Sequence, residues 1–329
     1  MRLLMLGGTE FVGRAIAEAA AAHGWEVTVF HRGRHAPPPG VRVLLGDRSS
    51  EDGLAALAQG EWDAVVDTWS GAPRAVRDTA RLLSGRAGRY VYISSRSVYA
   101  EPVAAGADET FPVVDASPDD AETDYARAKR GGELAASDAF GDRALLVRAG
   151  LIVGPGENVG RLPWWLTRIA RGGDVPAPGP PELALQYIDV RDLAGWVVAA
   201  ARGLGGVYNV VSLPGHTTMG ELLRTCVDVT GGHAQLRWRT PESVLASGAE
   251  PWTGLPVWLP PGSADYEHMH RSDVSKALAA GLRCRPVEET VADTWAWLRR
   301  IGGRAPQRPD RPKKGMDEET EARLLAMPE

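Results

Sequence analysis

Residues 123–129 read TDYARAK, and this stretch places a tyrosine four residues before a lysine. Residues four apart are neighbours on one face of a helix, so Tyr125 and Lys129 are expected to lie side by side. A phenol with a pKa of about 10 is a poor proton donor at neutral pH, but a nearby ammonium group favours the phenolate and lowers that pKa. Such a pair can deliver a proton to a carbonyl oxygen while hydride reaches the carbonyl carbon.

A pair of serines supplies a second part of the same chemistry. The apolar run RYVYIS (89–94) predicts a buried strand, and Ser94 and Ser95 stand where this strand ends. Ligands of doubly wound sheets bind at the carboxyl ends of the strands. A serine hydroxyl at that edge can hydrogen-bond both a substrate oxygen and the tyrosine hydroxyl.

A glycine-rich turn, GGTEFVG at 7–13, follows the apolar run RLLML and precedes an amphipathic stretch. A turn of this kind between a strand and a helix lets backbone N–H groups approach a pyrophosphate, and the helix dipole adds to the attraction. The segment therefore predicts a dinucleotide site. Its expected contacts in the turn are Gly7, Thr9, Glu10, Phe11, Val12 and Gly13.

The end of the second strand, VFHRGR, distinguishes the two nicotinamide cofactors. An acid there binds the ribose 2′-hydroxyl of NAD, whereas a guanidinium fork suits the 2′-phosphate of NADP. Here His31 and Arg32 replace the acid and Arg34 follows, which favours NADP(H), with NAD(H) as the alternative. Further cofactor contacts are expected from Asp47 and Arg48 near the adenine, and from Thr68, Trp69, Ser94, Tyr125 and Lys129.

Short apolar runs alternate with longer amphipathic ones in the first half of the chain. Continuous apolar strands separated by helices are typical of a parallel sheet covered on both faces, a doubly wound (Rossmann) α/β fold. We expect a dinucleotide-binding domain at 1–150, a smaller substrate-binding lobe with sheet-completing segments at 151–302, and a polar tail at 303–329 that ends in a short surface helix. Strands are expected at 2–6, 25–30, 41–45, 62–68, 89–94, 143–150 and 206–212, and helices at 11–23, 50–60, 73–85, 124–140, 191–203, 219–231 and 287–300.

These motifs together resemble the extended, atypical branch of the short-chain dehydrogenase/reductase family, and more closely its bacterial NAD-dependent epimerase/dehydratase-like reductases. GGTEFVG, SSRSVY, YARAK and VRAGLIVGPGE carry the resemblance, which covers about residues 1–300. It implies that Ser95, Tyr125 and Lys129 are catalytic and that the protein is a homodimer. The family pattern GGxGxxG has glycine where Glu10 stands, and a carboxylate there repels a pyrophosphate unless it turns outward or meets an arginine.

Tryptophan is the main indication of a substrate pocket, because 11 of the 329 residues are tryptophan. Trp69 follows the fourth strand, and Trp164 and Trp165 stand at the start of the second lobe. With Ser95 they are the expected substrate contacts, although most tryptophans pack into cores. Arg161, Arg168 and Arg171 are candidates for binding a diphosphate, or they face water.

Composition excludes several other classes of protein. A net charge of −5 and a pI of about 5.9 argue against nucleic acid as a partner, and no apolar run reaches membrane length. The two cysteines, Cys226 and Cys284, form no CxxC or His/Cys cluster, so no metal is expected and the thiols are those of a reduced, cytoplasmic protein.

The leading hypothesis is an NADPH-dependent oxidoreductase of secondary metabolism, which reduces a carbonyl or oxidises a secondary alcohol of a small metabolite through the Ser-Tyr-Lys triad. A nucleotide-sugar epimerase or dehydratase with retained NAD is the first alternative, because it has the same fold. A non-catalytic NADP(H)-sensing or RNA-binding protein is the second. Glu10 is the one feature in favour of the last alternative, and the acidic net charge disfavours RNA.

Overall fold

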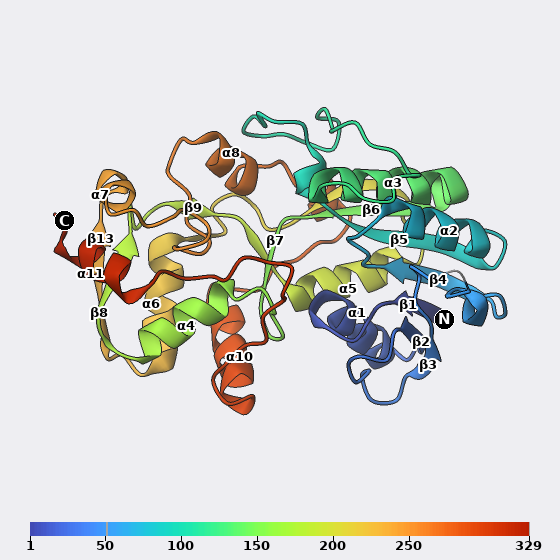
Figure 1. Ribbon diagram of the computed structural model, residues 1–329, viewed down its shortest axis with the longest axis horizontal. Helices are drawn as coiled ribbons and strands as arrows, with labels where there is room; N and C mark the ends of the chain where they lie inside the picture. The colour runs from blue at the N-terminus through green and yellow to red at the C-terminus, as the bar shows by residue number, and fades with distance from the viewer. Residues whose placement is uncertain (51, 329) are drawn as a thin grey trace.

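The computed structural model describes residues 1–50 and 52–328 and contains a seven-stranded sheet in the order β11-β6-β5-β4-β1-β2-β3. Every neighbouring pair in this sheet is parallel, which confirms the doubly wound α/β fold (Figure 1). The sheet strands are β1 (Arg2–Leu6), β2 (Glu26–His31), β3 (Arg42–Leu45), β4 (Trp62–Asp67), β5 (Ala87–Ser95), β6 (Ala144–Ala149) and β11 (Gly206–Val210).

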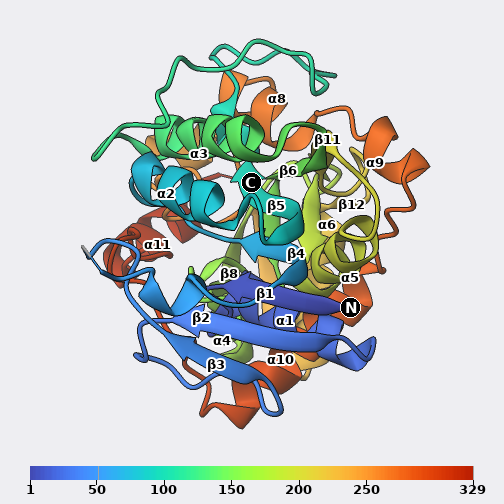
Figure 2. The same cartoon turned by 90° about the vertical axis from the view of Figure 1, so that its right-hand side faces the viewer.

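Helices cover both faces of the sheet, as Figure 2 shows. Side chains alternate between the faces of a strand, and β1 follows this rule. Leu3 and Met5 pack into one core and the intervening Leu4 packs into the other. The first core contains α1 (Phe11–Ala22) and α5 (Val190–Ala200), and the second contains α2 (Pro73–Leu83) and α3 (Tyr125–Phe140).

The second half of the chain builds a lobe with its own hydrophobic core, on the left in Figure 1. Three segments of this half, β11, α5 and α9 (Ser275–Ala279), join the sheet or pack on its core instead. The lobe contains β7 (Leu151–Val153), α4 (Arg161–Ala170), β8 (Gly173–Pro178), β9 (Ala184–Leu185), β10 (Tyr187–Asp189), β12 (Thr217–Thr218), α6 (Met219–Thr230), β13 (Ala234–Arg239), α7 (Pro241–Ala246), α8 (Ala264–His270) and α10 (Val287–Arg300). Among the residues described, no helix is both long and apolar enough to cross a membrane.

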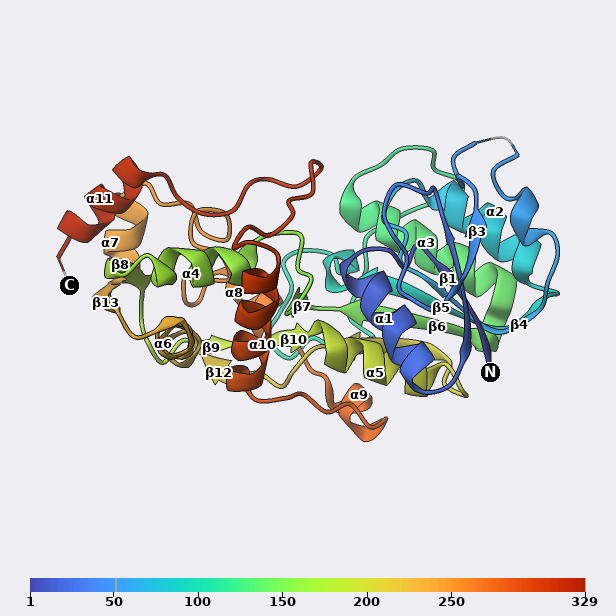
Figure 3. The same cartoon turned by 90° about the horizontal axis from the view of Figure 1, so that it is seen from below.

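The C-terminal segment is more closely attached than a polar tail suggests. Residues 303–317, here called the C-terminal strap, run from α10 toward the sheet and fold back to α11 (Glu318–Ala326) (Figure 3). The Arg308 N–H donates to the carbonyl of Asn158 at 3.0 Å. In α11, Leu324 is fully buried in the core of the lobe.

The prediction of a helix at 50–60 is wrong. Only a 3₁₀ turn, η1 (Ala55–Leu57), forms there, and Glu51 lies outside the described residues. Gly53 donates to the carbonyl of Ser50 and lies so close to the backbone of Asp47 that no side chain fits. The chain therefore turns back on itself instead of continuing as a helix. Two further 3₁₀ turns are η2 (Arg96–Val98) and η3 (Gly141–Arg143).

Candidate active site

A cavity of about 1230 Å³ lies along the carboxyl edge of the sheet. Its walls come from the strand ends, from the second lobe and from the C-terminal strap. The fold therefore brings distant segments of the sequence to one place, as expected for a doubly wound sheet. The sequence-predicted site residues that line it are Gly7, Thr9, Glu10, Phe11, Val12, Gly13, His31, Arg32, Asp47, Arg48, Thr68, Trp69, Ser94, Ser95, Tyr125 and Lys129.

The glycine-rich turn has the shape that a pyrophosphate requires. Gly7 has φ of +101°, and a Cβ there would lie 2.9 Å from Oγ1 of Thr68. A Cβ on Gly13 would lie 2.8 Å from the Gly8 nitrogen, so side chains are excluded at both positions. Phe11 starts α1 at φ of +32°, a strained value that is typical of functional turns. The residues present therefore fit a dinucleotide phosphate at the N-terminus of α1.

Glu10, which replaces a family glycine, is compensated by its surroundings. Its carboxylate lies 3.6 Å from Nε2 of His35 and 3.5 Å from Nδ2 of Asn158. The side-chain hydrogen bond with Asp310 raises the pKa of Arg308, and the Glu10 carboxylate adds to this effect. The carboxylate of Glu10 therefore has polar partners from the turn after β2 and from the second lobe, which reduces its repulsion of a nearby pyrophosphate.

The turn after β2 presents positive charge to the cavity. His31, Arg32 and Arg34 line it, and both arginines are exposed. The neighbouring Asp47 is occupied by the backbone and hydroxyl of Ser49, at 3.0 and 2.6 Å from its Oδ1. The guanidinium groups therefore remain available to an anion at this end of the cavity.

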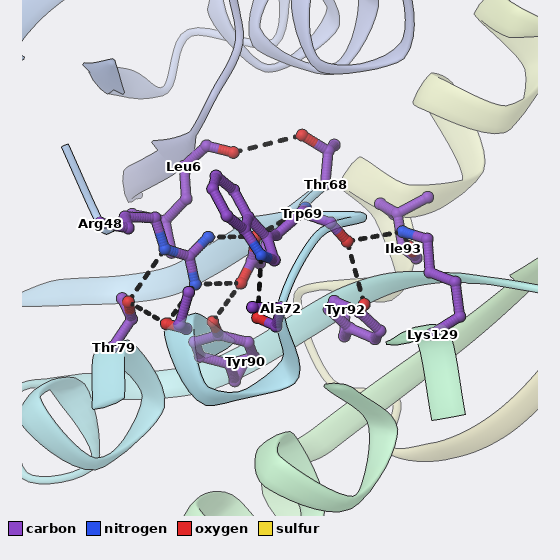
Figure 4. A network of polar contacts seen from close by, with 12 residues as sticks. Leu6, Arg48, Thr68, Trp69, Ala72, Thr79, Tyr90, Tyr92, Ile93 and Lys129 are labelled. Carbon is purple, nitrogen blue, oxygen red and sulfur yellow. Dashed lines mark hydrogen bonds and ion pairs between the residues drawn. The ribbon is translucent and has the colours of Figure 1, made fainter. Parts of the chain in front are cut away.

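Arg48 and Asp67 form a buried ion pair at the cavity floor (Figure 4). Nη1 and Nη2 of Arg48 donate to the two carboxylate oxygens at 2.7 and 2.8 Å, and Tyr90 Oη donates to Oδ2 at 2.6 Å. The adenine contact predicted for Arg48 stays a prediction: the side chain lines the cavity, while most of its donors bind Asp67, Thr79 and a backbone carbonyl. Asp67 was missed, although an acid at the end of an apolar strand was a usable signal.

The same network continues from β4 to the predicted catalytic lysine (Figure 4). The carbonyl of Trp69 accepts hydrogen bonds from Tyr92 Oη at 2.9 Å and from Lys129 Nζ at 2.7 Å. Lys129 Nζ also donates to the Ile93 carbonyl at 2.7 Å and lies 4.9 Å from the ring centroid of Tyr92. Only 4% of Lys129 is exposed, and this burial lowers its pKa to about 7. The ammonium group is therefore fixed inside the cavity wall.

Tyr125 is the first residue of α3, and Ser95 is the last residue of β5. The Asp124 carboxylate accepts from the Arg127 N–H at 3.0 Å, and this N-cap starts α3 at Tyr125. Ser95 Oγ accepts from the backbone N–H of Ser97 and donates to its hydroxyl, both at 3.1 Å. The structure thus brings the hydroxyls of Ser95 and Tyr125 and the ammonium of Lys129 to one cavity.

Ser94 has a different environment from Ser95, although both line the cavity. Its hydroxyl donates to Glu133 at 2.7 Å, and the side chain is buried. Arg148 binds the same carboxylate through Nε at 2.9 Å and Nη2 at 3.0 Å. Ser94 therefore supports the scaffold, whereas among the described residues the Ser95 hydroxyl forms hydrogen bonds only with Ser97.

The substrate contacts predicted for Trp164 and Trp165 do not fit their positions. Trp165 is completely buried and donates from Nε1 to the carbonyl of Pro256 at 2.8 Å. Trp164 packs edge-on against it, with ring centroids 4.7 Å apart. Both belong to the core of the second lobe, and neither lines the cavity. Trp252 lines the cavity instead. Neither its residue type nor its position in the sequence distinguishes it from the tryptophans of the core.

Besides Arg32, Arg34 and Arg48, four arginines line the cavity: Arg96, Arg161, Arg308 and Arg311. The sequence suggested Arg161, Arg168 and Arg171 as ligands of a diphosphate. Of these, only Arg161 lines the cavity, and Arg168 forms an ion pair with Glu321 of α11. Arg308 and Arg311 come from the strap, and the guanidinium of Arg311 lies 4.5 Å from the ring centroid of Tyr125. Arg96, within the serine motif, was also missed. Its position directly after the predicted residue Ser95 was the available signal.

Comparison with known proteins places these observations in context. A model described as the NAD dependent epimerase/dehydratase family matches residues 3–210. The protein y4nG of Sinorhizobium fredii is 28% identical over 198 residues, which cover 57% of this chain and 47% of y4nG, so the chain spans about half the length of that relative. A 3-diazoavenalumate denitrifying reductase of a Streptomyces species is 27% identical over 222 residues, which cover 61% of this chain and 72% of that reductase.

Solved structures share the fold. The UDP-glucose 4-epimerase of Thermus thermophilus, crystallised as a complex with NAD, aligns with a TM-score of 0.63 and 22% identity. The alignment covers 91% of this chain and 99% of that one. The likeness therefore extends through the sheet and the second lobe.

Proposed function

The chain belongs to the NAD dependent epimerase/dehydratase family, whose members are NAD(P)-dependent enzymes of the short-chain dehydrogenase/reductase type, and from this premise we propose that it is an NADP(H)-dependent oxidoreductase. It reduces a carbonyl, or oxidises a secondary alcohol, of a small metabolite. One observation carries the proposal: Ser95, Tyr125 and Lys129 share a cavity with a glycine-rich turn built for a pyrophosphate.

In this mechanism the nicotinamide ring, when bound, supplies or accepts a hydride at the substrate carbon. Tyr125 gives its hydroxyl proton to the substrate oxygen in reduction and takes it back in oxidation. Ser95 turns its hydroxyl from Ser97 to the same oxygen and orients it. Both groups act without large movement, because Ser95 ends a buried strand and Tyr125 begins a capped helix.

Lys129 binds ribose hydroxyls and, in its protonated form, stabilises negative charge on the tyrosine oxygen. The carbonyls of Trp69 and Ile93 hold its Nζ, and the Arg48–Asp67 pair braces the Trp69 loop through the Trp69 N–H, which donates to Asp67 at 2.9 Å. The ion pair and its tyrosines thus position Lys129 before any ligand binds.

NADP(H) is the proposed cofactor because the turn after β2 offers Arg32 and Arg34 with no ribose-binding acid of the kind that NAD uses. The 27% identical relative is named a reductase, which supports net reduction of a substrate. We further propose that the protein is a homodimer and that its substrate is a small metabolite of secondary metabolism, which it reduces.

An epimerase with retained NAD is the second candidate. The C-terminal strap lines the cavity through Arg308 and Arg311, and a segment that lies over a cofactor suits one that is not released. The NAD-bound epimerase with the same fold is consistent with this reading. Dinucleotide recovered from the denatured, purified protein, without NADPH consumption by any carbonyl, would select this candidate.

The proposed function is tested with Tyr125→Phe, which removes one hydroxyl. Turnover, followed by the loss of NADPH absorbance with a panel of aldehydes and ketones, should fall by about 10²- to 10⁴-fold. NADPH affinity, measured by its fluorescence, should be unchanged within about threefold, because the ring remains. Tyr208→Phe, at a buried tyrosine of β11 outside the cavity, is the matched control and should keep full turnover. Full turnover in Tyr125→Phe would overturn the mechanism.

A further inference from the structure

Arg96 is a buried cation at the cavity that the proposed chemistry does not use. It follows Ser95 in the chain and begins η2, and only 1% of it is exposed. Burying a guanidinium is costly unless a carboxylate or a full set of hydrogen bonds compensates it. The partners of Arg96 therefore indicate whether it is structural or awaits a ligand.

One edge of the Arg96 guanidinium has no partner. Nη1 donates to Oε1 of Gln186 at 3.3 Å and to the carbonyl of Met269 at 3.2 Å, and both acceptors are neutral. Nε and Nη2 are buried with no hydrogen bond. No ion pair joins Arg96 to any acid within the described part of the chain. The vacant edge is the one that binds a carboxylate with two parallel hydrogen bonds.

Other arginines of this protein show how that edge is normally filled. Arg148 uses Nε and Nη2 on the two oxygens of Glu133, and Arg191 uses them on Asp189. Arg285 uses the same two nitrogens on Asp192. Arg96 thus differs from Arg148, which is also buried and lies on the adjacent strand β6, in lacking the carboxylate.

The neighbours of Arg96 leave its charge in place. His268 Nε2 donates to the Arg96 carbonyl at 3.1 Å, and burial lowers the pKa of this histidine, so it is neutral near pH 7. Glu101 lines the same cavity but lies 4.0 Å from Nδ1 of His268 and forms no ion pair with Arg96. Burial lowers the pKa of Arg96 to about 10, so the guanidinium is still charged at neutral pH.

We propose that Arg96 binds a carboxylate group of the substrate through its Nε and Nη2 edge, so that the enzyme acts on carbonyl or alcohol compounds that also carry a carboxylate. This inference rests on the proposed oxidoreductase function and deepens it. Arg96 and Met269 both line the cavity, and the proposal requires that flexible side chains beside Arg96, such as that of Met269, shift to open the buried edge to the ligand. The carboxylate then holds the reacting carbon near Ser95 and Tyr125.

A carboxylate fits the vacant edge better than a phosphate does. One planar guanidinium edge offers two donors in the spacing of two carboxylate oxygens, whereas a phosphate dianion is usually held by several donors together.

The test compares acids with their methyl esters on protein saturated with NADP⁺, so that binding is read without turnover. The ligands are 4-formylbenzoate, levulinate and pyruvate, each beside its ester, with 4-formylphenyl phosphate as the anion of different shape. Wild-type protein should bind at least one acid about 10- to 100-fold tighter than its ester, the range expected for hydrogen bonds to a charged group. Arg96→Gln should abolish that preference, and Arg96→Lys should restore part of it.

Arg271→Gln is the matched control, because Arg271 is exposed, lies two residues after Met269 and does not line the cavity. It should keep the preference for the acid. A merely structural Arg96 would lower the melting temperature and weaken acid and ester equally. Equal binding of acid and ester by the wild type, persistence of the preference in Arg96→Gln, or tighter binding of the phosphate would each overturn the inference.

NADPH turnover with the same pairs separates the two proposals. If no carbonyl is turned over but the acid preference depends on Arg96, the oxidoreductase function fails and the carboxylate site stands. If turnover occurs and acid and ester have the same kcat/KM in wild type and Arg96→Gln, the function stands and the carboxylate site fails.

Discussion

The two ends of the cavity hold their charges in different ways. At the cofactor end, Arg48 is paired with Asp67, and Glu10 faces His35 and Asn158. At the substrate end, Arg96 has a vacant guanidinium edge, and Arg311 contacts Tyr125 through the face of its ring. Charges that are satisfied within the chain make a rigid frame, whereas charges that are left over indicate what the ligand must bring.

Substitutions at the cofactor end, where Arg48 is paired with Asp67, should change mainly the stability of the protein. Asp67→Asn leaves the Arg48 cation buried with a weakened partner, so the free energy of unfolding should fall by about 3–5 kcal/mol, measured by urea denaturation. Asp78→Asn, which disrupts the partly exposed ion pair with Arg77, is the control and should cost under about 1 kcal/mol. Equal losses for the two variants would show that the Arg48–Asp67 pair does not stabilise the frame.

The exposed arginines after β2 should respond in cofactor choice and not in stability. Arg32→Asp replaces a phosphate-binding group with a ribose-binding one, so the ratio of kcat/KM for NADPH over NADH should fall by about 10- to 100-fold. Arg42→Asp makes the same charge change at an exposed residue of β3 outside the cavity. A similar fall in both variants would attribute the effect to net charge alone.

Lys129 connects the two ends, and its titration measures how strongly the frame desolvates it. Its folded pKa of about 7 lies below the unfolded value of about 10.4, so the unfolded chain binds more protons between these values. Its contribution to stability should therefore be unfavourable below pH 7 and should improve as the pH rises toward 10. NMR of isotope-labelled lysine, with Lys129→Met identifying the resonance, should show a midpoint near 7. A midpoint near the unfolded value would contradict the described burial.

The strap should have the smallest effect. Arg311→Gln removes a cation over the Tyr125 ring, an interaction of about 1 kcal/mol for two half-buried side chains. KM for a carbonyl substrate should rise about two- to fivefold, with kcat nearly unchanged. Arg304→Gln, at a strap arginine outside the cavity, should leave both constants alone. A large fall in kcat would instead show that Arg311 takes part in the chemical step.

Much of the cofactor end could be predicted because it follows from local pattern. Continuous apolar runs indicate parallel strands, and the strand-end rule places Ser95 and the glycine-rich turn at one edge. The partner of Arg48 could not be predicted, since it depends on how the loop after β3 meets the end of β4. The position of Trp164 could not be predicted either, because tryptophan is common both in a buried core and in the wall of a ligand pocket.

The substrate end was less predictable for a physical reason. The strap at 303–317 is polar and has no apolar period, so nothing local in it indicates that Arg308 and Arg311 return to the cavity. Its path is fixed by distant contacts, such as that between the Gly315 N–H and the Thr253 carbonyl. Ligand-facing residues of this kind become visible only after the second lobe is folded.

The central claim is that a dinucleotide lies along this cavity with its nicotinamide at Tyr125 and Lys129. A crystal structure of the protein with bound NADP⁺ tests it most directly. We expect the pyrophosphate on the turn at 7–13, the 2′-phosphate beside Arg32, and C4 of the nicotinamide beside the hydroxyl of Tyr125. A dinucleotide bound elsewhere, or a nicotinamide ring turned away from Tyr125 with Lys129 out of reach of its ribose, would contradict the claim.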